Sequence, residues 1–231
     1  MDVIAGVIFD KDGTLFDFRS SWGRWCGALL GALSRDTRHL VQLAQAIGYD
    51  PQTNQFAPDS PVIAGTPVEI AECLLPLMPQ MTVQALEARI NGLAAQAEMT
   101  PAVALRPLLQ GLRDRGLRLG LATNDTEVPA QAHLDQHGIT DLFDMIMGCD
   151  SGYGAKPGPG MLLAFAAQVG LRPAACIMVG DSRHDLMAGR AAGMRTVAVL
   201  TGVAEAEDLA DLADVVLADI SGLPGWLETQ A

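Results

Sequence analysis

The chain of 231 residues carries 27 acidic and 15 basic side chains, which gives a formal net charge of −12. This charge excludes a broad nucleic-acid interface, which needs a basic face, and a hydrophobic content of 49% excludes a disordered chain. The apolar runs are too short to span a bilayer, the first residues do not form a signal peptide, and the four cysteines form no closely spaced pair, so we expect a cytoplasmic protein that contacts neither membrane nor nucleic acid.

Six short apolar runs, most of them separated by helical patterns, predict an open parallel α/β sheet. Such runs fit strands that are buried on both faces, and their alternation with helices is typical of a parallel sheet. The predicted strands cover residues 3–10, 117–125, 143–150, 175–181, 195–202 and 213–220. The predicted helices between them cover residues 107–115, 128–137, 160–169 and 185–192.

The stretch from residue 17 to residue 104 interrupts this alternation and favours helices only. Residues 20–47 are predicted as one long helix or two, and residues 50–65, rich in Pro, Asn, Gln and Asp, as a loop. Thr66 and Thr82 each begin a further predicted helix. A helical insertion after the first strand predicts a cap over one edge of the sheet.

Four of the predicted strands end in polar residues. The polar sets are Asp10-Lys11-Asp12, Thr123-Asn124-Asp125, Cys149-Asp150 and Gly180-Asp181-Ser182. In a parallel sheet the carboxyl ends of the strands share one edge, where ligands bind. Because carboxylates gathered at one edge repel each other, we expect a divalent cation there.

The first set belongs to the most specific motif, Asp-x-Asp-Gly-Thr-Leu directly after an apolar strand. Two carboxylates two residues apart can divide the work, Asp10 attacking phosphorus and Asp12 moving protons. Gly13 permits a tight turn that brings the backbone near a ligand. An ordinary acidic turn is the alternative interpretation for the Asp-x-Asp-Gly letters alone.

Two later positions suit the binding of a phosphate group. Thr123 and Asn124 offer a hydroxyl and backbone amides at a strand end, although an ordinary helix cap would use the same residue types. Lys156 stands in a loop that contains two prolines, and the chain has only one other lysine, Lys11. We therefore expect the Lys156 ammonium to bind phosphate and offset the clustered acids, rather than lie in solvent.

Asp181 and Asp185 are four residues apart around a predicted helix start. If the helix begins near Ser182, Asp185 can turn back toward Asp181, so the pair suits a metal ligand and its supporting partner. Matching of the helix dipole would explain Asp185 alone, but it explains the whole constellation less easily.

Together, these elements resemble the four motifs of the haloacid dehalogenase (HAD) superfamily, in the same order and each at a strand end. The chain looks most like the phosphoglycolate phosphatase-like branch, which also holds β-phosphoglucomutase-like and phosphonatase-like relatives. The resemblance implies an α/β, Rossmann-like three-layer core, residues 1–17 and 105–231, with an inserted all-helical C1 cap, residues 18–104.

The same resemblance implies a role for each motif residue. Asp10 is expected to form an aspartyl-phosphate, while Asp12 protonates the leaving alcohol and then activates water. Thr123 and Lys156 are expected to hold the phosphoryl group, and Asn124 to add a backbone amide.

The resemblance also implies Mg²⁺ as the cofactor. The expected ligands are Asp10, the Asp12 backbone carbonyl and Asp181, with Asp185 in support. Three arginines near the cap could meet a substrate carboxylate: Arg19, Arg24 and Arg106. Trp22 and Trp25 are expected to pack. Three histidines are expected to lie at the surface or at the edge of the cap: His39, His133 and His137.

The expected activity is hydrolysis of a small phosphorylated metabolite, with phosphoglycolate as the leading substrate, by a monomer or a homodimer. The main alternative is a phosphoryl transferase of the β-phosphoglucomutase type, whose cap would hold a sugar phosphate. A dehalogenase is disfavoured because that branch needs neither Asp12 nor Asp181. A domain that binds metal or phosphate without catalysis is a further alternative, which no sequence feature favours.

Overall fold

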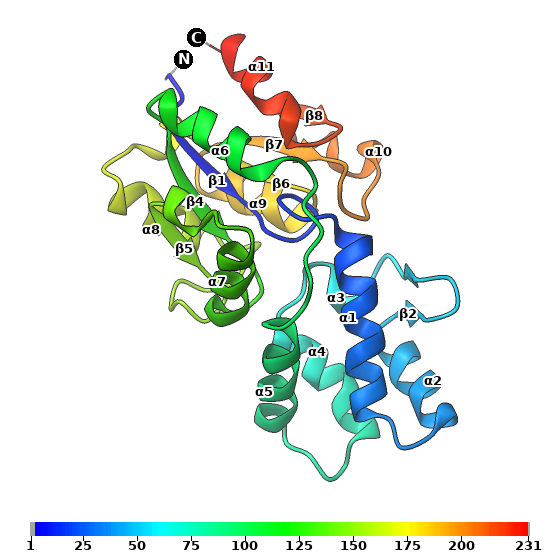
Figure 1. The fold of residues 1–231 in the computed structure, drawn as a ribbon. Coiled ribbons are helices and arrows are strands. Elements are labelled where there is room, and N and C mark those ends of the chain that lie inside the picture. The colour runs from blue at the N-terminus through cyan, green and yellow to red at the C-terminus, as the bar shows by residue number, and fades with distance from the viewer. Residues whose placement is uncertain (1–2, 231) are drawn as a thin grey trace.

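Figure 1 shows the computed structural model, which describes residues 3–230. The core is a six-stranded sheet in the order β5-β4-β1-β6-β7-β8, and every neighbouring pair is parallel. The strands are β1 (Gly6–Phe9), β4 (Arg118–Ala122), β5 (Met145–Met147), β6 (Cys176–Gly180), β7 (Arg195–Val199) and β8 (Val215–Leu217). All six predicted strands are present, and each is shorter than its apolar run.

Helices cover both faces of the sheet. They are α6 (Leu105–Asp114), α7 (Glu127–Gln136) and α11 (Leu223–Glu228) on one face, and α8 (Gly160–Gln168) and α9 (Arg183–Ala191) on the other. Because successive side chains of a strand point to opposite faces, Val7 and Phe9 pack with the first group and Ile8 packs with the second. The predicted three-layer α/β core is therefore confirmed.

Shorter helical elements connect the larger ones. They are α10 (Ala206–Leu209), which follows β7, and the 3₁₀ turns Leu75–Leu77, Thr140–Leu142, Pro173–Ala175 and Ile220–Gly222. No helix in the described part of the chain is long and apolar enough to cross a membrane.

The insertion after β1 forms a separate group of helices below the sheet in Figure 1. Its helices are α1 (Phe18–Leu33), α2 (Thr37–Ala46), α3 (Pro61–Ala64), α4 (Pro67–Leu74) and α5 (Val83–Ala94). Asp17 begins α1 by accepting a hydrogen bond from the Ser20 amide at 2.8 Å, and Thr66 begins α4 in a reciprocal capping box with Glu69. The segment predicted as one helix or two is two helices.

The segment predicted as a loop, residues 50–65, contains part of a short antiparallel hairpin that the sequence did not predict. The strands β2 (Tyr49–Asp50) and β3 (Gln55–Phe56) have two residues each, which is too short for an alternating pattern to show. Asn54 supplies the positive φ of 55° at which the chain turns. The expectation of an insert with helices only is corrected in this detail.

Two connections join the insertion to the core, and they run side by side. The Asp17 amide donates to the Thr100 carbonyl at 2.8 Å, and the Ala102 amide donates to the Leu15 carbonyl at 2.9 Å. We propose that the cap extends over residues 18–104. The carboxyl ends of β1, β4 and β6 face this insertion (Figure 1), so the polar strand ends lie between core and cap.

Candidate active site

The ends of three neighbouring strands bring the predicted polar residues together. Asp10 follows β1, Thr123 and Asn124 follow β4, and Asp181 follows β6, and all four side chains are buried. The remaining polar set, Cys149-Asp150, does not join them, because the Asp150 carboxylate accepts a hydrogen bond from the Glu127 amide at the start of α7.

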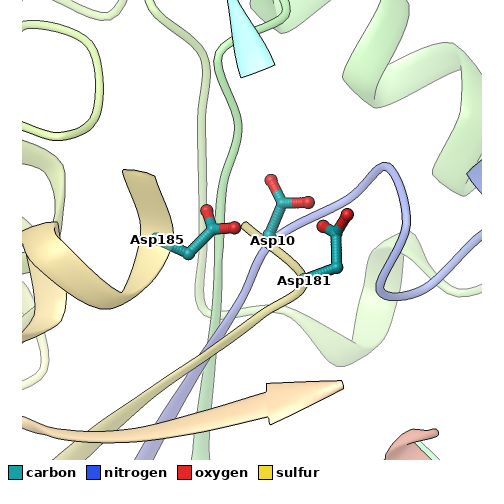
Figure 2. A group of neighbouring side chains, drawn as sticks. All are labelled: Asp10, Asp181 and Asp185. Carbon is teal, nitrogen blue, oxygen red and sulfur yellow. The ribbon is translucent and has the colours of Figure 1, made fainter. Parts of the chain in front are cut away.

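Three carboxylates converge at this edge, as Figure 2 shows for Asp10, Asp181 and Asp185. One oxygen from each lies within 4.8 Å of the others. Asp185 comes from the first turn of α9, where its Oδ2 accepts hydrogen bonds from the amide and the hydroxyl of Ser182 at 3.0 and 2.6 Å. Its Oδ1 accepts from Lys156 at 2.6 Å, so both oxygens are engaged, which fits the expected supporting role.

Asp181 is the carboxylate most available to a cation. Among the described residues, its only side-chain hydrogen bond comes from the Thr14 hydroxyl at a long 3.5 Å. Gly13 lies directly against the Asp181 carboxylate. Its φ is +84°, and a Cβ at this position would lie 2.3 Å from Asp181 Oδ2. Carboxylate oxygens with this freedom are the donors that a hard divalent cation prefers, so the residues present fit such an ion.

The Lys156 ammonium lies at the centre of the cluster. It donates to Asp10 Oδ1 at 2.6 Å, to Asp185 Oδ1 at 2.6 Å and to the Ala122 carbonyl at 2.7 Å, which uses all three of its N–H groups. Burial alone would lower the pKa of Lys156, but the carboxylates of Asp10 and Asp185 outweigh it and raise that pKa. The lysine is therefore charged and pins one oxygen of Asp10.

The protonation of the acids follows from burial and from their mutual repulsion. Burial raises the pKa of Asp10 to about 7, against the opposing effect of Lys156. Burial, with the charges of Asp10 and Asp185, raises the pKa of Asp181 well above its ordinary value. Without a cation the cluster holds protons near neutral pH, and a bound cation would displace them.

The Thr123 hydroxyl is a candidate hydrogen-bond donor to a phosphate group. Its oxygen accepts a hydrogen bond from the Asp125 amide at 3.1 Å, which leaves the hydroxyl proton available to a ligand oxygen. Asn124 acts through its side chain, which bonds the backbone of Lys156 and, at 2.8 Å, the Ala64 carbonyl at the end of α3 in the insertion.

A second buried lysine forms a network that the sequence did not predict. Lys11 is completely buried, and its ammonium contacts Asp12 Oδ2 at 3.0 Å, Asp125 Oδ2 at 2.8 Å and His133 Nδ1 at 2.9 Å. Since an ammonium has no acceptor, His133 Nδ1 must accept, and its Nε2–H then donates to the Ala94 carbonyl at 2.8 Å. This fixes a neutral imidazole, and burial followed by the Lys11 charge lowers the pKa of His133 to about 3.

Two members of this network were missed. His133 was expected to lie at the surface, and it is only 1% exposed. The sequence indicated Asp125 only as part of the polar set that follows β4. The scarcity of lysine marked Lys11 as unusual, but partners 114 and 122 residues away leave no local signal.

The network leaves the two oxygens of Asp12 in different states. Oδ2 is held by Lys11, whereas Oδ1 is buried and has no hydrogen-bond partner among the described residues. Burial raises the pKa of Asp12, although Lys11 opposes this effect. A carboxyl group with one oxygen anchored and the other free is suited to passing a proton.

The three arginines expected near the substrate lie elsewhere. Arg19 donates to the Gln55 side chain, Arg24 donates to the Glu98 carbonyl at 3.0 Å, and Arg106 forms a two-point ion pair with Asp141 at 2.9 Å. None of the three lines the cavity between core and insertion. Trp22 and Trp25, which were expected only to pack, do line it.

Comparison with known proteins agrees with this geometry. Residues 4–193 match the family model described as haloacid dehalogenase-like hydrolase, so the chain belongs to that family. The predicted superfamily is confirmed, and with it the prediction of an enzyme.

Particular relatives point to one branch of the family. The chain is 32% identical over 203 residues to a phosphoglycolate phosphatase of Xylella fastidiosa, covering 87% of this chain and 82% of the relative. It is 31% identical over 202 residues to a phosphoglycolate phosphatase of Xanthomonas campestris, covering 87% and 86%.

Solved structures show the same fold. A predicted phosphoglycolate phosphatase from Haemophilus somnus superposes with a TM-score of 0.70 at 20% identity, covering 98% of this chain and 99% of that one. A putative β-phosphoglucomutase from Thermotoga maritima has the same TM-score of 0.70 at 16% identity, covering 99% and 100%. At these identities the two structures support the fold and do not separate the two activities.

Proposed function

We propose that this protein is a Mg²⁺-dependent phosphatase that hydrolyses small phosphate monoesters through an aspartyl-phosphate on Asp10. The observation that carries the proposal is the different environment of two carboxylates in one loop. Asp10 is anchored through Oδ1 by Lys156 and has no further side-chain partner among the described residues, whereas Asp12 is anchored through Oδ2 by Lys11 and keeps Oδ1 free. The first arrangement suits a nucleophile and the second an acid.

In the first step, an Asp10 carboxylate oxygen attacks phosphorus and the bond from phosphorus to the alcohol oxygen breaks. The proton on Asp12 passes to that oxygen, so the alcohol leaves neutral. In the second step, Asp12 takes a proton from a water molecule, whose oxygen attacks phosphorus. The bond from phosphorus to Asp10 then breaks, inorganic phosphate leaves, and Asp12 has its proton again.

Other residues of the chain orient and neutralise the phosphoryl group. The Thr123 hydroxyl can donate to one phosphoryl oxygen, and the Lys156 charge lies beside the attacking carboxylate. Asp10, Asp181 and the Asp12 backbone carbonyl would hold the Mg²⁺ ion, with Asp185 in support. When bound, the ion supplies positive charge that offsets the phosphoryl oxygens and the clustered acids.

The test is phosphate release from a panel of phosphate monoesters with and without Mg²⁺, for the wild type and for Asp10→Asn and Asp12→Asn. A matched control is Asp36→Asn, because Asp36 only caps α2 through the His39 amide, a role that Asn can also fill. We expect activity in the control, none with Asp10→Asn, and a phosphorylated protein to accumulate with Asp12→Asn. Full activity of Asp10→Asn, or equal turnover with and without Mg²⁺, would refute the proposal.

Phosphoglycolate belongs in this panel because the relatives from Xylella fastidiosa and Xanthomonas campestris are named phosphoglycolate phosphatases. β-Glucose 1-phosphate tests the alternative transferase, which would convert it without net phosphate release. The insertion offers mainly apolar side chains to the cavity, which is a poor match for the many hydroxyl groups of a sugar. This lining supports the hydrolase over the transferase.

A further inference from the structure

The cavity between the core and the insertion has two chemically different walls. The core wall carries the carboxylates, Thr123, Asn124 and Lys156 that were described above. The wall from the insertion is built by Trp22 and Trp25 of α1, Ile63 of α3, Ile70 of α4 and Ile90 of α5, which are all apolar in body. A monoester bound with its phosphoryl group on the core wall would place its alcohol against the apolar wall.

No lysine or arginine in the cavity lining is free to meet a second negative charge. The only lysine that lines it, Lys156, already uses its three N–H groups on Asp10, Asp185 and Ala122. Lys11 lies outside the lining and is likewise saturated by three partners. The remaining basic side chain in the lining is His184, which is exposed at the start of α9.

The acids in the lining add to this imbalance. Asp10, Asp12, Asp125, Asp181 and Asp185 all border the cavity, and together they outnumber its one lysine. A divalent cation would offset part of this charge at the phosphoryl end. A carboxylate on the leaving alcohol would still enter a largely dry wall without a lysine or an arginine to pair with, which is costly.

The apolar wall carries two buried indole N–H groups. The indole N–H of Trp25 is buried and has no partner among the described residues, whereas that of Trp22 lies close enough to Asp12 to oppose the rise in the pKa of that carboxyl. The two rings pack edge to face with centroids 4.8 Å apart, so each indole is held in place by the other. An indole N–H only donates, so leaving it without an acceptor is costly. A ligand that satisfies this wall offers an acceptor oxygen to Trp25, and the lack of a free lysine or arginine in the lining favours a neutral one.

We infer that this cavity selects phosphate monoesters of uncharged alcohols with an apolar or aromatic body, and that it disfavours carboxylate-bearing esters such as phosphoglycolate. The inference rests on the proposed function, since it assigns the alcohol part of that substrate. Trp22 and Trp25 are the specificity-determining residues. The three arginines expected near the substrate, Arg19, Arg24 and Arg106, all bind other partners, which agrees with this assignment.

The experiment compares kcat/KM for three esters of primary alcohols, so that the leaving groups differ little in reactivity. The esters are phosphoglycolate, 2-hydroxyethyl phosphate, which has a neutral hydroxyl in place of the carboxylate, and benzyl phosphate. With Mg²⁺ present, we expect both neutral esters to exceed phosphoglycolate by on the order of ten-fold or more. A wild-type preference for phosphoglycolate overturns the inference and leaves the phosphatase intact, whereas hydrolysis of none of the three overturns both.

Two variants locate the selectivity in the wall. Trp25→Arg supplies a cation and is expected to raise kcat/KM for phosphoglycolate relative to benzyl phosphate by about ten-fold. Trp25→Phe keeps the ring and removes the N–H, so it is expected to weaken 2-hydroxyethyl phosphate more than benzyl phosphate. An unchanged ranking of the three esters in both folded variants would contradict the role of Trp25, and the wild-type ranking remains decisive if Trp25→Arg does not fold.

Discussion

Lys156 and Asn124 are joined by two reciprocal hydrogen bonds. The Lys156 amide donates to Asn124 Oδ1 at 2.8 Å, and Asn124 Nδ2 donates to the Lys156 carbonyl at 2.9 Å. The same Nδ2 reaches the Ala64 carbonyl of the insertion. One amide therefore fixes the Lys156 loop to the end of β4 and links both to the insertion.

This relationship predicts the effect of Asn124→Asp. A carboxylate cannot donate, so it would face the carbonyls of Lys156 and Ala64 without a hydrogen bond and release the Lys156 loop. We expect kcat/KM to fall by about ten-fold or more in a steady-state assay. Asn91→Asp in α5, where Oδ1 has no partner, makes the same chemical change outside the site and should retain activity. Equal effects of the two variants would contradict this prediction.

Lys11→Met tests the buried network behind Asp12. The substitution leaves Asp12, Asp125 and His133 without the charge that they share, and breaking a buried ion pair costs about 3–5 kcal/mol. We expect that loss in urea unfolding, measured as a lower midpoint at constant slope. Adding Asp125→Asn removes the carboxylate charge that Lys11→Met leaves unpaired, so the double variant should recover part of the stability. A single variant within about 1 kcal/mol of the wild type would be the opposite result.

His133 predicts a pH dependence of stability. Its pKa is about 3 in the folded protein and 6.5 for the free side chain, so the unfolded chain binds the proton more tightly. The contribution of neutral His133 to the free energy of unfolding is complete above pH 6.5 and is lost as pH falls toward 3. Over this range the free energy of unfolding changes by at most about 1.4 kcal/mol per pH unit. His133→Gln does not titrate, so its unfolding free energy should fall less steeply over this range. Parallel curves for the two proteins would show that His133 does not titrate in this way.

Replacing Gly13 is expected to lower activity by more than the strain at a glycine of positive φ explains. Gly13→Ala places a Cβ 2.3 Å from Asp181 Oδ2, in addition to the strain of a φ of +84°. Gly116→Ala has the matching φ of +82° and nothing within 4 Å, so it isolates the strain. We expect similar small losses of stability, but a fall in kcat on the order of a hundred-fold only for Gly13→Ala. Comparable kcat values would mean that Asp181 tolerates displacement.

Metal removal predicts proton uptake by the acidic cluster. Because the pKa of Asp10 is about 7 and that of Asp181 is also raised, a divalent cation must displace protons near neutral pH. We expect Mg²⁺ affinity to increase between about pH 6 and 8, by at most roughly ten-fold per pH unit for each proton displaced. Calorimetry in buffers of different ionisation enthalpy measures the protons released. An affinity independent of pH would contradict the raised pKa of Asp10.

The sequence by itself determined the core and the order of its motifs. Each apolar run that ends in a polar set became a parallel strand, because its side chains suit the two faces of a sheet that helices cover. The same periodicity placed Asp10, Thr123 and Asp181 at one edge. Short-range geometry was sufficient here, since strand direction and a following turn decide where these side chains lie.

The tertiary structure alone decided what surrounds those residues. The Lys11 network joins residues separated by more than 100 positions, and the partners of Arg19 and Arg106 came from segments that no local pattern connects to them. Trp22 and Trp25 read as packing residues because an apolar helix face looks the same whether it meets a core or a cavity. Local periodicity encodes which face is apolar, whereas the packing of the insertion against the sheet decides what that face contacts.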